Sequence, residues 1–438
     1  MVVSEIQTQN SEQGQMIVRS SRSLKKVAVV GFGTVGTGVV GKLIQGLTGV
    51  ELTKVVVRHP GKRRQLSINS SYITTDYREV INDPEIDVII ELTTDARGAR
   101  KLALEALRNG KDFVTSNKQL IADYGHEIFE LALREKRYVG FRGTFVGCHF
   151  LIHELGLARL LGEQRVKNVY AILNGTCNYI LSSMTNGMSF ESALAEAQAK
   201  GYAELDPSDD IDGWDTARKV RILLRIIHNS MLLPGKFPVT GIRDITIQDI
   251  EYAKELGYRV KLLGVIQRRD SYNYVSVHPA LVPKNSLLGS IEGEYNGIRV
   301  ESEDGIEWGL VAPGAGKDAT ASAVIKDLID IANGIPPLTP NGESAIVIGN
   351  GVETISRWYL RVGVLDQPGV LAKISGIFAK HGISISAVLQ KEATSIDFVP
   401  IVLTTHEANE RRLRAAVKRI DSLSVVKAKT KVIQILDA

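Results

Sequence analysis

The apolar positions near the start of the chain follow a strand period and then a helix period. Val27-Ala-Val-Val30 is a continuous apolar run, and the segment 39–44 places apolar side chains three and four positions apart. Between them lies a glycine-rich turn, Gly31-Phe-Gly-Thr-Val-Gly36. A strand, a G-x-G-x-x-G turn and an amphipathic helix form the opening unit of a dinucleotide-binding fold. We therefore predict an α/β Rossmann nucleotide-binding domain over residues 24–150.

Each glycine of this turn has its own expected role. Gly31 permits the tight turn, Gly33 lets the backbone approach a pyrophosphate, and Gly36 permits close packing of the helix on the strand. The N-terminus of the helix supplies unpaired N–H groups to the phosphates. The predicted cofactor-binding residues of this turn are Gly31, Phe32, Gly33, Thr34, Val35 and Gly36.

Apolar runs at 51–57, 88–92 and 112–115 predict three more strands of this domain. The first of them ends in Arg58-His-Pro-Gly-Lys-Arg-Arg64, where an acidic residue would hold a ribose 2′-hydroxyl. Basic side chains suit a 2′-phosphate, so we predict NADP(H) in preference to NAD(H), with Arg58 as a ligand. An ordinary basic surface loop is the alternative. The strand at 112–115 brings Lys118 to the carboxyl edge of the sheet, where ligands bind in open α/β folds.

The segment from Gly201 to Lys219 is rich in carboxylates and ends in a lysine. Asp215 and Lys219 stand four residues apart at the start of an apolar run, which puts both side chains on one face of a helix. A lysine beside a carboxylate can transfer a proton, and further carboxylates nearby can hold a cationic amino group. A solvated acidic loop followed by a surface ion pair is the alternative.

Residues 151–310 differ in character from the first domain. Helices are predicted at 189–200, 217–228 and 246–256, and strands at 166–173, 258–267, 272–281 and 297–301. Asn174-Gly175 is interpreted as the turn that closes the first of these strands. The order predicts an α+β domain, with catalytic and dimerisation roles, whose sheet can pair with that of a second subunit.

Pro and Gly residues predict a linker at 335–353. Beyond it, strands are predicted at 358–365, 383–390, 398–404 and 425–435, and helices at 370–381 and 408–420. This βαββαβ order over 354–438 resembles the ACT domain, a ferredoxin-like module that senses amino acids. The turn after its first strand would offer N–H groups to the carboxylate of an effector, through Asp366, Gly369 and Val370. A packing or dimerisation module without a ligand is the alternative.

The composition is ordinary for a globular protein of two to three domains. The 438 residues are 44% apolar and 23% charged, and the formal net charge is +4. Basic residues are scattered, so we predict no nucleic-acid binding, and no apolar run reaches about eighteen residues, so we predict no membrane span. Cys148 and Cys177 form no metal-ligand pattern and suggest a reducing, cytoplasmic compartment, with Cys177 as a packing residue rather than a nucleophile. Residues 1–23 are polar and predict a disordered tail.

Together these segments resemble homoserine dehydrogenases of the long, regulated type. The resemblance runs from about Lys25 to the C-terminus and includes, besides the motifs above, Thr115-Ser-Asn-Lys118, Asn174-Gly-Thr-Cys-Asn-Tyr-Ile180, Gly241-Ile-Arg-Asp-Ile245, and Gly314-Ala-Gly316 with Thr320-Ala-Ser-Ala-Val324. It implies NAD(P)H-dependent reduction of L-aspartate 4-semialdehyde to L-homoserine, on the route to threonine and methionine. It also implies that residues at about 311–334 return to the first domain and complete it. The implied assembly is a homodimer or homotetramer, and the implied effector is threonine.

The resemblance assigns roles to individual residues. Lys219 matches the catalytic lysine that donates a proton to the aldehyde oxygen, and Lys118 matches a second active-site lysine near the nicotinamide, with Asp215 beside them as a third catalytic residue. The residues implied for substrate binding are Glu204, Asp210, Thr176 and Tyr202. Gly201 and Gly316 are implied to border the cofactor.

Two segments depart from the family pattern. Arg142 to Phe150 stands where the family usually carries a glutamate and a glycine-rich stretch that build a monovalent-cation site. A guanidinium would repel a cation, so we expect no such cation site here. Phe145 and His149 in the same segment would alter the shape of the nearby nicotinamide pocket. Glu91-Leu-Thr-Thr-Asp95 replaces a glycine pair and would crowd the cofactor. These departures leave two other hypotheses open: a non-catalytic homologue that binds nucleotide or amino acid for regulation, and a dehydrogenase of another amino-acid semialdehyde.

Overall fold

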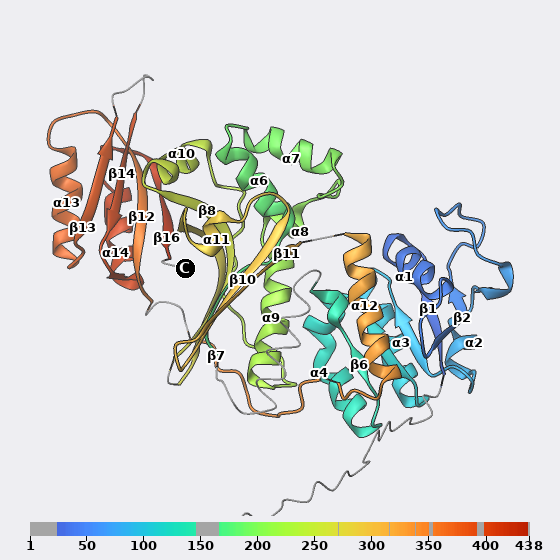
Figure 1. Ribbon diagram of the computed structural model, residues 1–438. Helices are drawn as coiled ribbons and strands as arrows, with labels where there is room; N and C mark the ends of the chain where they lie inside the picture. The colour runs from blue at the N-terminus through green and yellow to red at the C-terminus, as the bar shows by residue number, and fades with distance from the viewer. Residues whose placement is uncertain are drawn as a thin grey trace, which may run out of the picture.

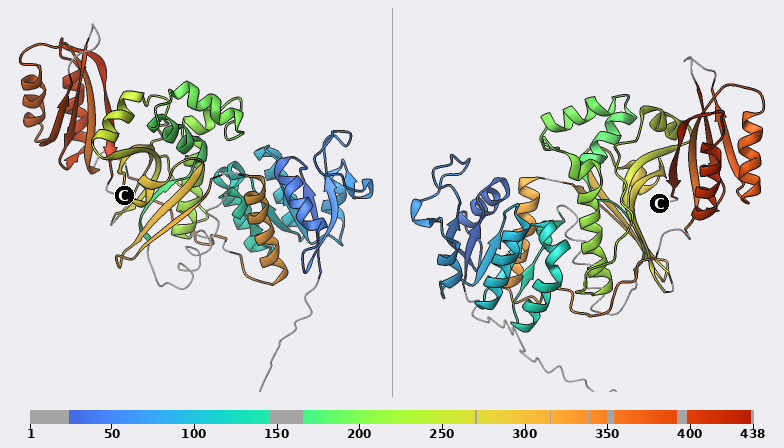
Figure 2. Two further views of the ribbon diagram at one scale, coloured as in Figure 1. Left: turned by 45° about the horizontal axis from the view of Figure 1, so that its top comes forward. Right: turned by 180° about the vertical axis from the view of Figure 1, so that it is seen from behind.

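The computed structural model describes residues 24–145, 166–269, 271–314, 316–337, 339–349, 354–391 and 398–436. They form three domains that lie in a row, with the N-terminal domain at one end and the C-terminal domain at the other (Figure 1, Figure 2). The predicted tail at 1–23, the boundary at 150, Cys148, His149 and part of the predicted linker lie outside the described residues.

The N-terminal domain is built on a parallel sheet of six strands in the order β3-β2-β1-β4-β5-β6. The strands are β1 (Lys25–Val30), β2 (Val50–Val56), β3 (Ile73–Thr74), β4 (Val88–Glu91), β5 (Asp112–Thr115) and β6 (Val139–Gly140). The helices between them are α1 (Thr34–Ile44), α2 (Tyr77–Asn82), α3 (Ala96–Arg108) and α4 (Lys118–Arg134), with short 3-10 turns at Ser70–Tyr72 and Arg142–Thr144. Because the strand order reverses between β1 and β4, the carboxyl ends of these two strands open a crevice for a ligand.

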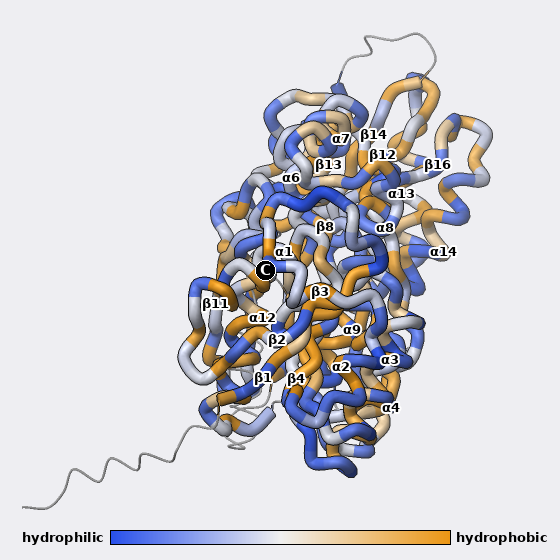
Figure 3. The backbone as a smooth tube through the Cα atoms, turned by 90° about the vertical axis from the view of Figure 1, so that its right-hand side faces the viewer, coloured by the Kyte–Doolittle hydropathy of each residue, from blue (hydrophilic) through white to orange (hydrophobic). Residues whose placement is uncertain are grey.

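Helices cover both faces of this sheet. One face packs against α1 and against α12 (Lys317–Ala332), which returns to this domain from far along the sequence. The other face packs against α2, α3 and α4. A sheet buried on both sides favours strands with continuous apolar runs, and Figure 3 shows the apolar runs of β1 and β4 among more polar helices and loops. The strands are therefore rigid supports for the turns at their carboxyl ends.

The central domain contributes five antiparallel strands, in the order β11-β10-β7-β8-β9, to a second sheet. They are β7 (Val166–Ile172), β8 (Tyr258–Arg268), β9 (Asn273–Pro283), β10 (Tyr295–Ser302) and β11 (Glu307–Pro313). The helices are α6 (Gly175–Thr185), α7 (Phe190–Ala199), α8 (Ser208–Ile211), α9 (Trp214–His228), α10 (Ile247–Glu255) and α11 (Leu287–Ser290).

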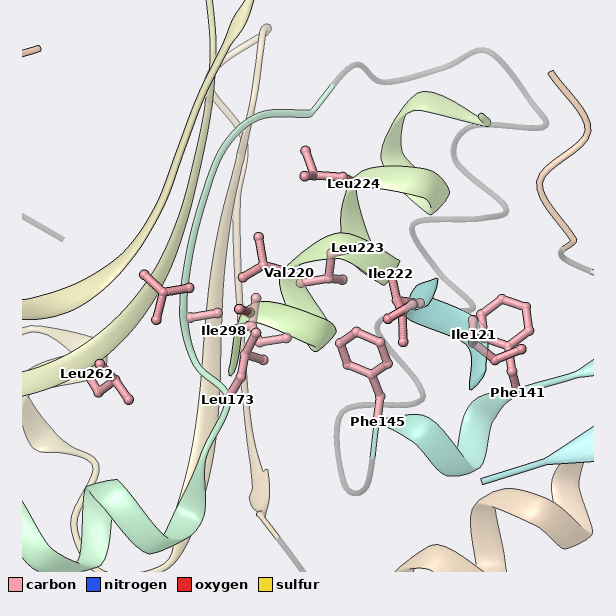
Figure 4. Packing of buried hydrophobic residues seen from close by; sticks show 14 of the residues in the cluster. Ile121, Phe141, Phe145, Leu173, Val220, Ile222, Leu223, Leu224, Leu262 and Ile298 are labelled. Carbon is pink, nitrogen blue, oxygen red and sulfur yellow. The ribbon is translucent and has the colours of Figure 1, made fainter. Parts of the chain in front are cut away.

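Helix α9 lies between the central sheet and the N-terminal domain. Figure 4 shows Val220 facing Leu173 and Ile298 on the sheet side, while Ile222 and Phe145 lie on the side of the N-terminal domain. Phe145 is 1% exposed and belongs to this hydrophobic cluster. The helix is thereby fixed against both domains at once.

The C-terminal domain has the predicted βαββαβ order. Its elements are β12 (Ile355–Val364), α13 (Val370–Lys380), β13 (Ile385–Gln390), β14 (Val399–Thr405), α14 (Glu410–Asp421) and β16 (Val426–Ile435), with a short β15 (Ala408–Asn409). Its strands continue the second sheet, because β16 pairs in parallel with β9 at two positions, Gln434 with Ala280 and Ile435 with Leu281. The fold class expected from the sequence, Rossmann, α+β and ACT, is confirmed.

A buried ion pair also joins the central domain to the C-terminal domain. Asp249 on α10 is fully buried and accepts hydrogen bonds from Arg361 Nε at 2.7 Å and from the hydroxyl of Tyr359 at 3.3 Å. Asp249 also completes a capping box with Thr246 at the start of α10. The C-terminal domain is thus held to the central domain by a satisfied buried charge as well as by strand pairing.

The segment at Asn174-Gly175 differs from its prediction as a turn. Gly175 is the first residue of α6, and Asn174 is its N-cap, whose Oδ1 accepts a hydrogen bond from the backbone N–H of Cys177 at 2.8 Å. Asparagine is favoured both in turns and at helix N-caps, so the residue type alone does not separate the two. The difference matters because α6 brings Asn174 and Thr176 to the domain boundary.

Candidate active site

Asp215 is the centre of a charged cluster at the boundary between the N-terminal and central domains. It lies in the first turn of α9 and is 4% exposed. Its Oδ1 is 2.5 Å from Nζ of Lys118, the first residue of α4 in the N-terminal domain, and its Oδ2 is 2.9 Å from Nζ of Lys219 on α9 itself. The structure therefore brings together Lys118, Asp215 and Lys219, the three residues predicted as catalytic.

Lys219 is held on two sides. It is 4% exposed and donates a short hydrogen bond to the carbonyl oxygen of Leu173, at the end of β7, in addition to its bond with Asp215. Asn174 Nδ2 donates to Asp215 Oδ2 at 3.0 Å and to Asp210 Oδ1 at 2.7 Å. The ammonium of Lys219 is thus held by hydrogen bonds rather than free to rotate, and Asn174 joins the lysine cluster to Asp210.

The charges in this cluster shift one another's pKa values. Burial alone would raise the pKa of Asp215, but Lys118 and Lys219 outweigh it and hold that pKa well below its usual range. Burial works against the charge of Lys118, but the Asp215 carboxylate raises the pKa of Lys118 above its usual value. Burial and then the repulsion of Asp215 raise the pKa of Asp210, against the hydrogen bond from Asn174. The two lysines therefore favour the ionised form of Asp215.

The glycine-rich turn has the shape that a dinucleotide pyrophosphate requires. Gly31 has φ +106°, a conformation that favours glycine, and a Cβ on Gly36 would lie 2.1 Å from the carbonyl oxygen of Gly31. Gly33 is the N-cap of α1, and nothing lies within 4 Å of where its Cβ would be. The open space at Gly33 and the free N–H groups of the first turn of α1 fit a phosphate group.

The basic loop after β2 lies beside this turn. Arg58 is largely exposed, with a 77% exposed side chain and a loose ion pair of 3.7 Å to Asp95. Arg64 instead folds back: its guanidinium lies 5.3 Å above the ring of Phe32, and its Nε donates to the carbonyl oxygen of Phe32 at 3.3 Å. Arg58 is therefore available to a ligand, whereas Arg64 supports the glycine-rich turn.

Glu91 begins the second segment that departs from the family pattern. It is fully buried at the end of β4 and accepts hydrogen bonds from the hydroxyl of Thr115 at 2.6 Å and from the N–H of Thr93 at 2.6 Å. Asn117 Nδ2 in turn donates to the carbonyl oxygen of Thr93 at 3.2 Å and caps α4 immediately before Lys118. The sequence analysis missed this network, although a carboxylate within an apolar strand is a visible signal for it.

The residues implied for the substrate fall into two groups. Asp210 joins the lysine cluster through Asn174, and the hydroxyl of Thr176 donates to the carbonyl oxygen of Tyr202 at 2.6 Å. The side chain of Glu204 is exposed and makes no hydrogen bond or ion pair with another described residue. Gly201 ends α7 with φ +76°, and Gly316 is the N-cap of α12 with φ +139°. None of these backbone positions is blocked by a neighbouring side chain.

Arg142 points away from solvent into the interior. Its guanidinium binds Asp327 at 2.5 Å and Asp330 at 2.7 Å, both on α12, and Lys326 binds Asp330 at 2.9 Å. Two carboxylates therefore compensate the charge of Arg142. The expectation that Arg142 repels a monovalent cation by its charge alone is weakened accordingly. Residues 146–150 of this segment lie outside the described residues. Within the described ranges, no group of three or more His, Cys, Asp and Glu side chains is arranged to hold a metal ion.

Comparison with known proteins identifies the family. The homoserine dehydrogenase NAD-binding domain matches residues 31–142, the homoserine dehydrogenase domain matches residues 152–329, and the ACT domain matches residues 358–425. A homoserine dehydrogenase of Pseudomonas aeruginosa is 36% identical over 421 residues, which cover 92% of this chain and 96% of that protein. The chain belongs to the homoserine dehydrogenase family.

Solved homoserine dehydrogenases have the same fold. The enzyme of Thiobacillus denitrificans aligns with a TM-score of 0.86 and 34% identity, over 94% of this chain and 98% of that one. A hyperthermophilic archaeal homoserine dehydrogenase in complex with NADPH aligns with a TM-score of 0.61 and 25% identity, over 72% of this chain and 99% of that one. The archaeal enzyme therefore aligns with a smaller share of this chain than the Thiobacillus enzyme does.

Homoserine dehydrogenase activity follows from the family. The chain is an oxidoreductase that uses NAD(P)H to reduce L-aspartate 4-semialdehyde to L-homoserine, and its C-terminal ACT domain fits control by an amino acid. These matches favour this function over the two other hypotheses raised from the sequence. Across the part of the chain that the structure describes, no helix is both long and apolar enough to cross a membrane.

Proposed function

We propose that the cluster of Lys118, Asp215 and Lys219 is the acid–base centre of an NADP(H)-preferring homoserine dehydrogenase under end-product control. The observation that carries this proposal is the pairing of both lysines, from two different domains, with the two oxygens of one buried carboxylate. The cluster is complete only when the N-terminal and central domains meet, which is where a cofactor in the first domain and a substrate in the second must react.

In this proposal each side chain has one task. Bound NAD(P)H supplies the hydride for the aldehyde carbon. Lys219 donates a proton from Nζ to the aldehyde oxygen as negative charge develops there, and Lys118 stabilises the same charge from the other domain. Asp215 keeps both ammonium groups aimed at one point, and its carboxylate favours the return of a proton to Lys219 after the transfer.

The substrate carries an ammonium group and a carboxylate besides the aldehyde. We assign the ammonium to Asp210, with Glu204 as a second partner after the exposed 201–206 segment moves. Asp210 supports this role because Asn174 ties it to the lysine cluster, which fixes the distance between the amino group and the reacting carbon. Thr176 and Tyr202, joined by a hydrogen bond, form the neighbouring wall.

A substitution of Arg58 tests the proposed preference for NADPH over NADH. Replacing Arg58 with alanine should raise the Kd of NADPH by about tenfold or more, because a charge-assisted bond to the 2′-phosphate is lost, and leave the Kd of NADH nearly unchanged. Fluorescence titration with each cofactor measures both values. Arg64→Ala is the contrasting variant: it removes support from Phe32, which both cofactors would use, and should weaken both alike. Equal losses in Arg58→Ala would mean that the loop does not recognise the phosphate.

We also expect no specific activation by sodium or potassium. The position of the family's cation-binding glutamate is occupied by Arg142, whose guanidinium brings no oxygen ligand and is itself bound by Asp327 and Asp330. Initial rates with added sodium, potassium or choline chloride at constant ionic strength should coincide within about twofold, the scatter that general salt screening leaves. A rate increase confined to one alkali cation would contradict this expectation.

End-product control is proposed to act through the C-terminal domain. Asp366, Gly369 and Val370 lie in the turn between β12 and α13, where the helix N-terminus can attract a carboxylate such as that of threonine; the N–H of Val370 makes a long bond of 3.4 Å to the carbonyl oxygen of Gln367. Deleting the domain is a poor test, since Tyr359 and Ile433 belong to the same hydrophobic cluster as the central domain. Point substitutions in the turn are preferable. The exposed edge strand β11 further supports pairing of two chains into a homodimer, or of two such pairs into a homotetramer.

A further inference from the structure

The carbonyl oxygen of Leu173 accepts hydrogen bonds from two buried side chains. Lys219 Nζ donates a short bond from α9, and Asn296 Nδ2 donates a long one, of 3.4 Å, from β10. These bonds are not part of the strand ladder, because the pairing of β7 with β10 ends at Ile172 and Gly297, one residue before Leu173. A carbonyl oxygen has two lone pairs and can accept from both donors at once. The backbone at the end of β7 therefore joins Asn296 to the lysine to which we assign proton transfer.

The side chain of Asn296 has little freedom to move. It is 2% exposed, and the residue lies opposite Ala312 in the pairing of β10 with β11. Gly314 covers the amide: a Cβ on Gly314 would lie 2.5 Å from Asn296 Oδ1, and Gly314 N–H donates to the carbonyl oxygen of Glu294 at 3.0 Å. Among the described residues, no donor reaches Asn296 Oδ1. Turning the amide over would bring two acceptor oxygens together, so Nδ2 is the atom that faces Leu173.

We propose that Asn296 is a positioning residue for proton transfer, which acts on Lys219 through the carbonyl oxygen of Leu173. This inference rests on the proposed function, because it takes Lys219 as the acid. An ammonium group has three hydrogens, and Asp215 and Leu173 bind two of those on Lys219. The direction of the third hydrogen therefore follows from where these two acceptors lie. Asn174 holds the Asp215 carboxylate in place, and Asn296 does the same for the Leu173 carbonyl.

The Leu173 peptide unit needs this support because of where it lies. Leu173 is fully buried, and the chain leaves β7 and enters α6 at the next residue, the N-cap Asn174. Without the Asn296 donor, the carbonyl can turn toward Lys219 and move the ammonium group with it. Catalysis is sensitive to such movements, since a displacement of about 1 Å can cost about 100-fold in rate. A contact that is weakened but not broken should cost less, about tenfold, which is the upper contribution of one uncharged hydrogen bond.

Steady-state kinetics of Asn296→Leu test the inference, because leucine removes the donor and nearly keeps the volume of the side chain. We expect kcat for reduction of aspartate semialdehyde to fall about tenfold. The KM for the semialdehyde and the Kd of NADPH should barely change, since Lys219 and not Asn296 meets the substrate. The solvent deuterium isotope effect on kcat should increase, because proton transfer becomes slower relative to the other steps. Asn296→Ala removes the same donor with a smaller side chain and serves if the leucine variant does not fold.

Asn168 provides a matched control on the same sheet. It lies on β7, is 9% exposed, and donates from Nδ2 to Glu301 at 2.8 Å, while its Oδ1 also has no partner among the described residues. Asn168→Leu should lower the Tm at least as much as Asn296→Leu does, because a hydrogen bond to a carboxylate is stronger than one to a carbonyl oxygen. It should nevertheless leave kcat and the isotope effect unchanged, since Asn168 has no contact with the lysine cluster among the described hydrogen bonds.

A double-mutant cycle with Lys219→Ala shows whether Asn296 acts through the lysine. In the Lys219→Ala background, Asn296→Leu should change kcat by less than about twofold, because the group that it positions is absent. Three results would overturn the inference: an unchanged kcat in both Asn296 variants, the same tenfold loss with and without Lys219, or an equal loss of kcat in Asn168→Leu. If Lys219→Ala itself kept the rate of the unchanged enzyme, the proposed function would fail, and that outcome is separate from these three.

Discussion

Replacing Lys219 with alanine should lower kcat by roughly two to four orders of magnitude, the usual contribution of a general acid. Among the described residues, Lys219 is bound by a carbonyl oxygen as well as by Asp215 and Lys118 by Asp215 alone, so we expect the remaining hydrogen of Lys219 to face the substrate. The Kd of NADPH should barely change, because the lysine is remote from the glycine-rich turn. Stopped-flow measurement of NADPH oxidation with aspartate semialdehyde gives the rate, and fluorescence titration gives the Kd.

A second variant separates proton transfer from charge. Lys219→Arg keeps a positive charge beside Asp215, but a guanidinium does not release its proton at accessible pH. If Lys219 is the acid, the arginine variant should be nearly as slow as the alanine variant. Recovery of activity in the arginine variant, or an alanine variant within about threefold of the unchanged enzyme, would remove Lys219 from proton transfer.

Replacing Asp215 with asparagine should have an effect of similar size, about two to three orders of magnitude in kcat/KM, because loss of one carboxylate disorders two catalytic lysines. The substitution keeps the shape of the side chain, but Lys118 and Lys219 would then face each other without a counter-charge. Asp209→Asn is the matched control: Asp209 belongs to the same acidic segment, but its carboxylate binds Arg218 on the surface. That variant should stay within about twofold, as exposed ion pairs contribute little.

The same variant should move the pH profile in a defined direction. Asp215 raises the pKa of Lys118 against the effect of burial, so its removal lets burial lower that pKa. Lys118 then loses its proton at a lower pH than before. The alkaline limb of kcat/KM against pH should therefore shift to lower pH in Asp215→Asn. An alkaline limb that stays in place would show that Lys118 does not need its proton for turnover.

The positions of Lys118, Asp215 and Lys219 could be predicted because their signals are local. Asp215 and Lys219 are four residues apart on one helix, and Lys118 directly follows a strand of a parallel sheet, where side chains reach the ligand-binding edge. The glycine-rich turn was likewise confined to six residues. In each of these cases the position of the side chain depends on one helix or strand and on where that element ends. The spacing of apolar residues along the sequence is therefore sufficient to predict that position.

The partners of buried charges could not be predicted in this way. Arg142 meets Asp327 and Asp330 from a helix that lies far along the chain, and Arg361 meets Asp249 across two domains. Such pairs depend on how complete elements pack, which no local period encodes. Partial signals were present: Asp327 and Asp330 interrupt an otherwise apolar face of α12. A buried charge is stable only when it is paired. The sequence therefore shows which buried residues need a partner, but it does not show which residue that partner is.

The parallel pair of β9 and β16 has a consequence for synthesis of the chain. The edge of β9 at Ala280 and Leu281 is covered by the last strand of the protein, so it stays open while more than a third of the chain is still being translated. At about 5–20 residues per second this interval lasts on the order of ten seconds. Arg361, the partner of Asp249, also follows it far along the chain, although it is translated earlier than the last strand. We therefore expect the nascent central domain to expose an unpaired strand edge until residues 434 and 435 emerge, and such an edge can pair with other chains.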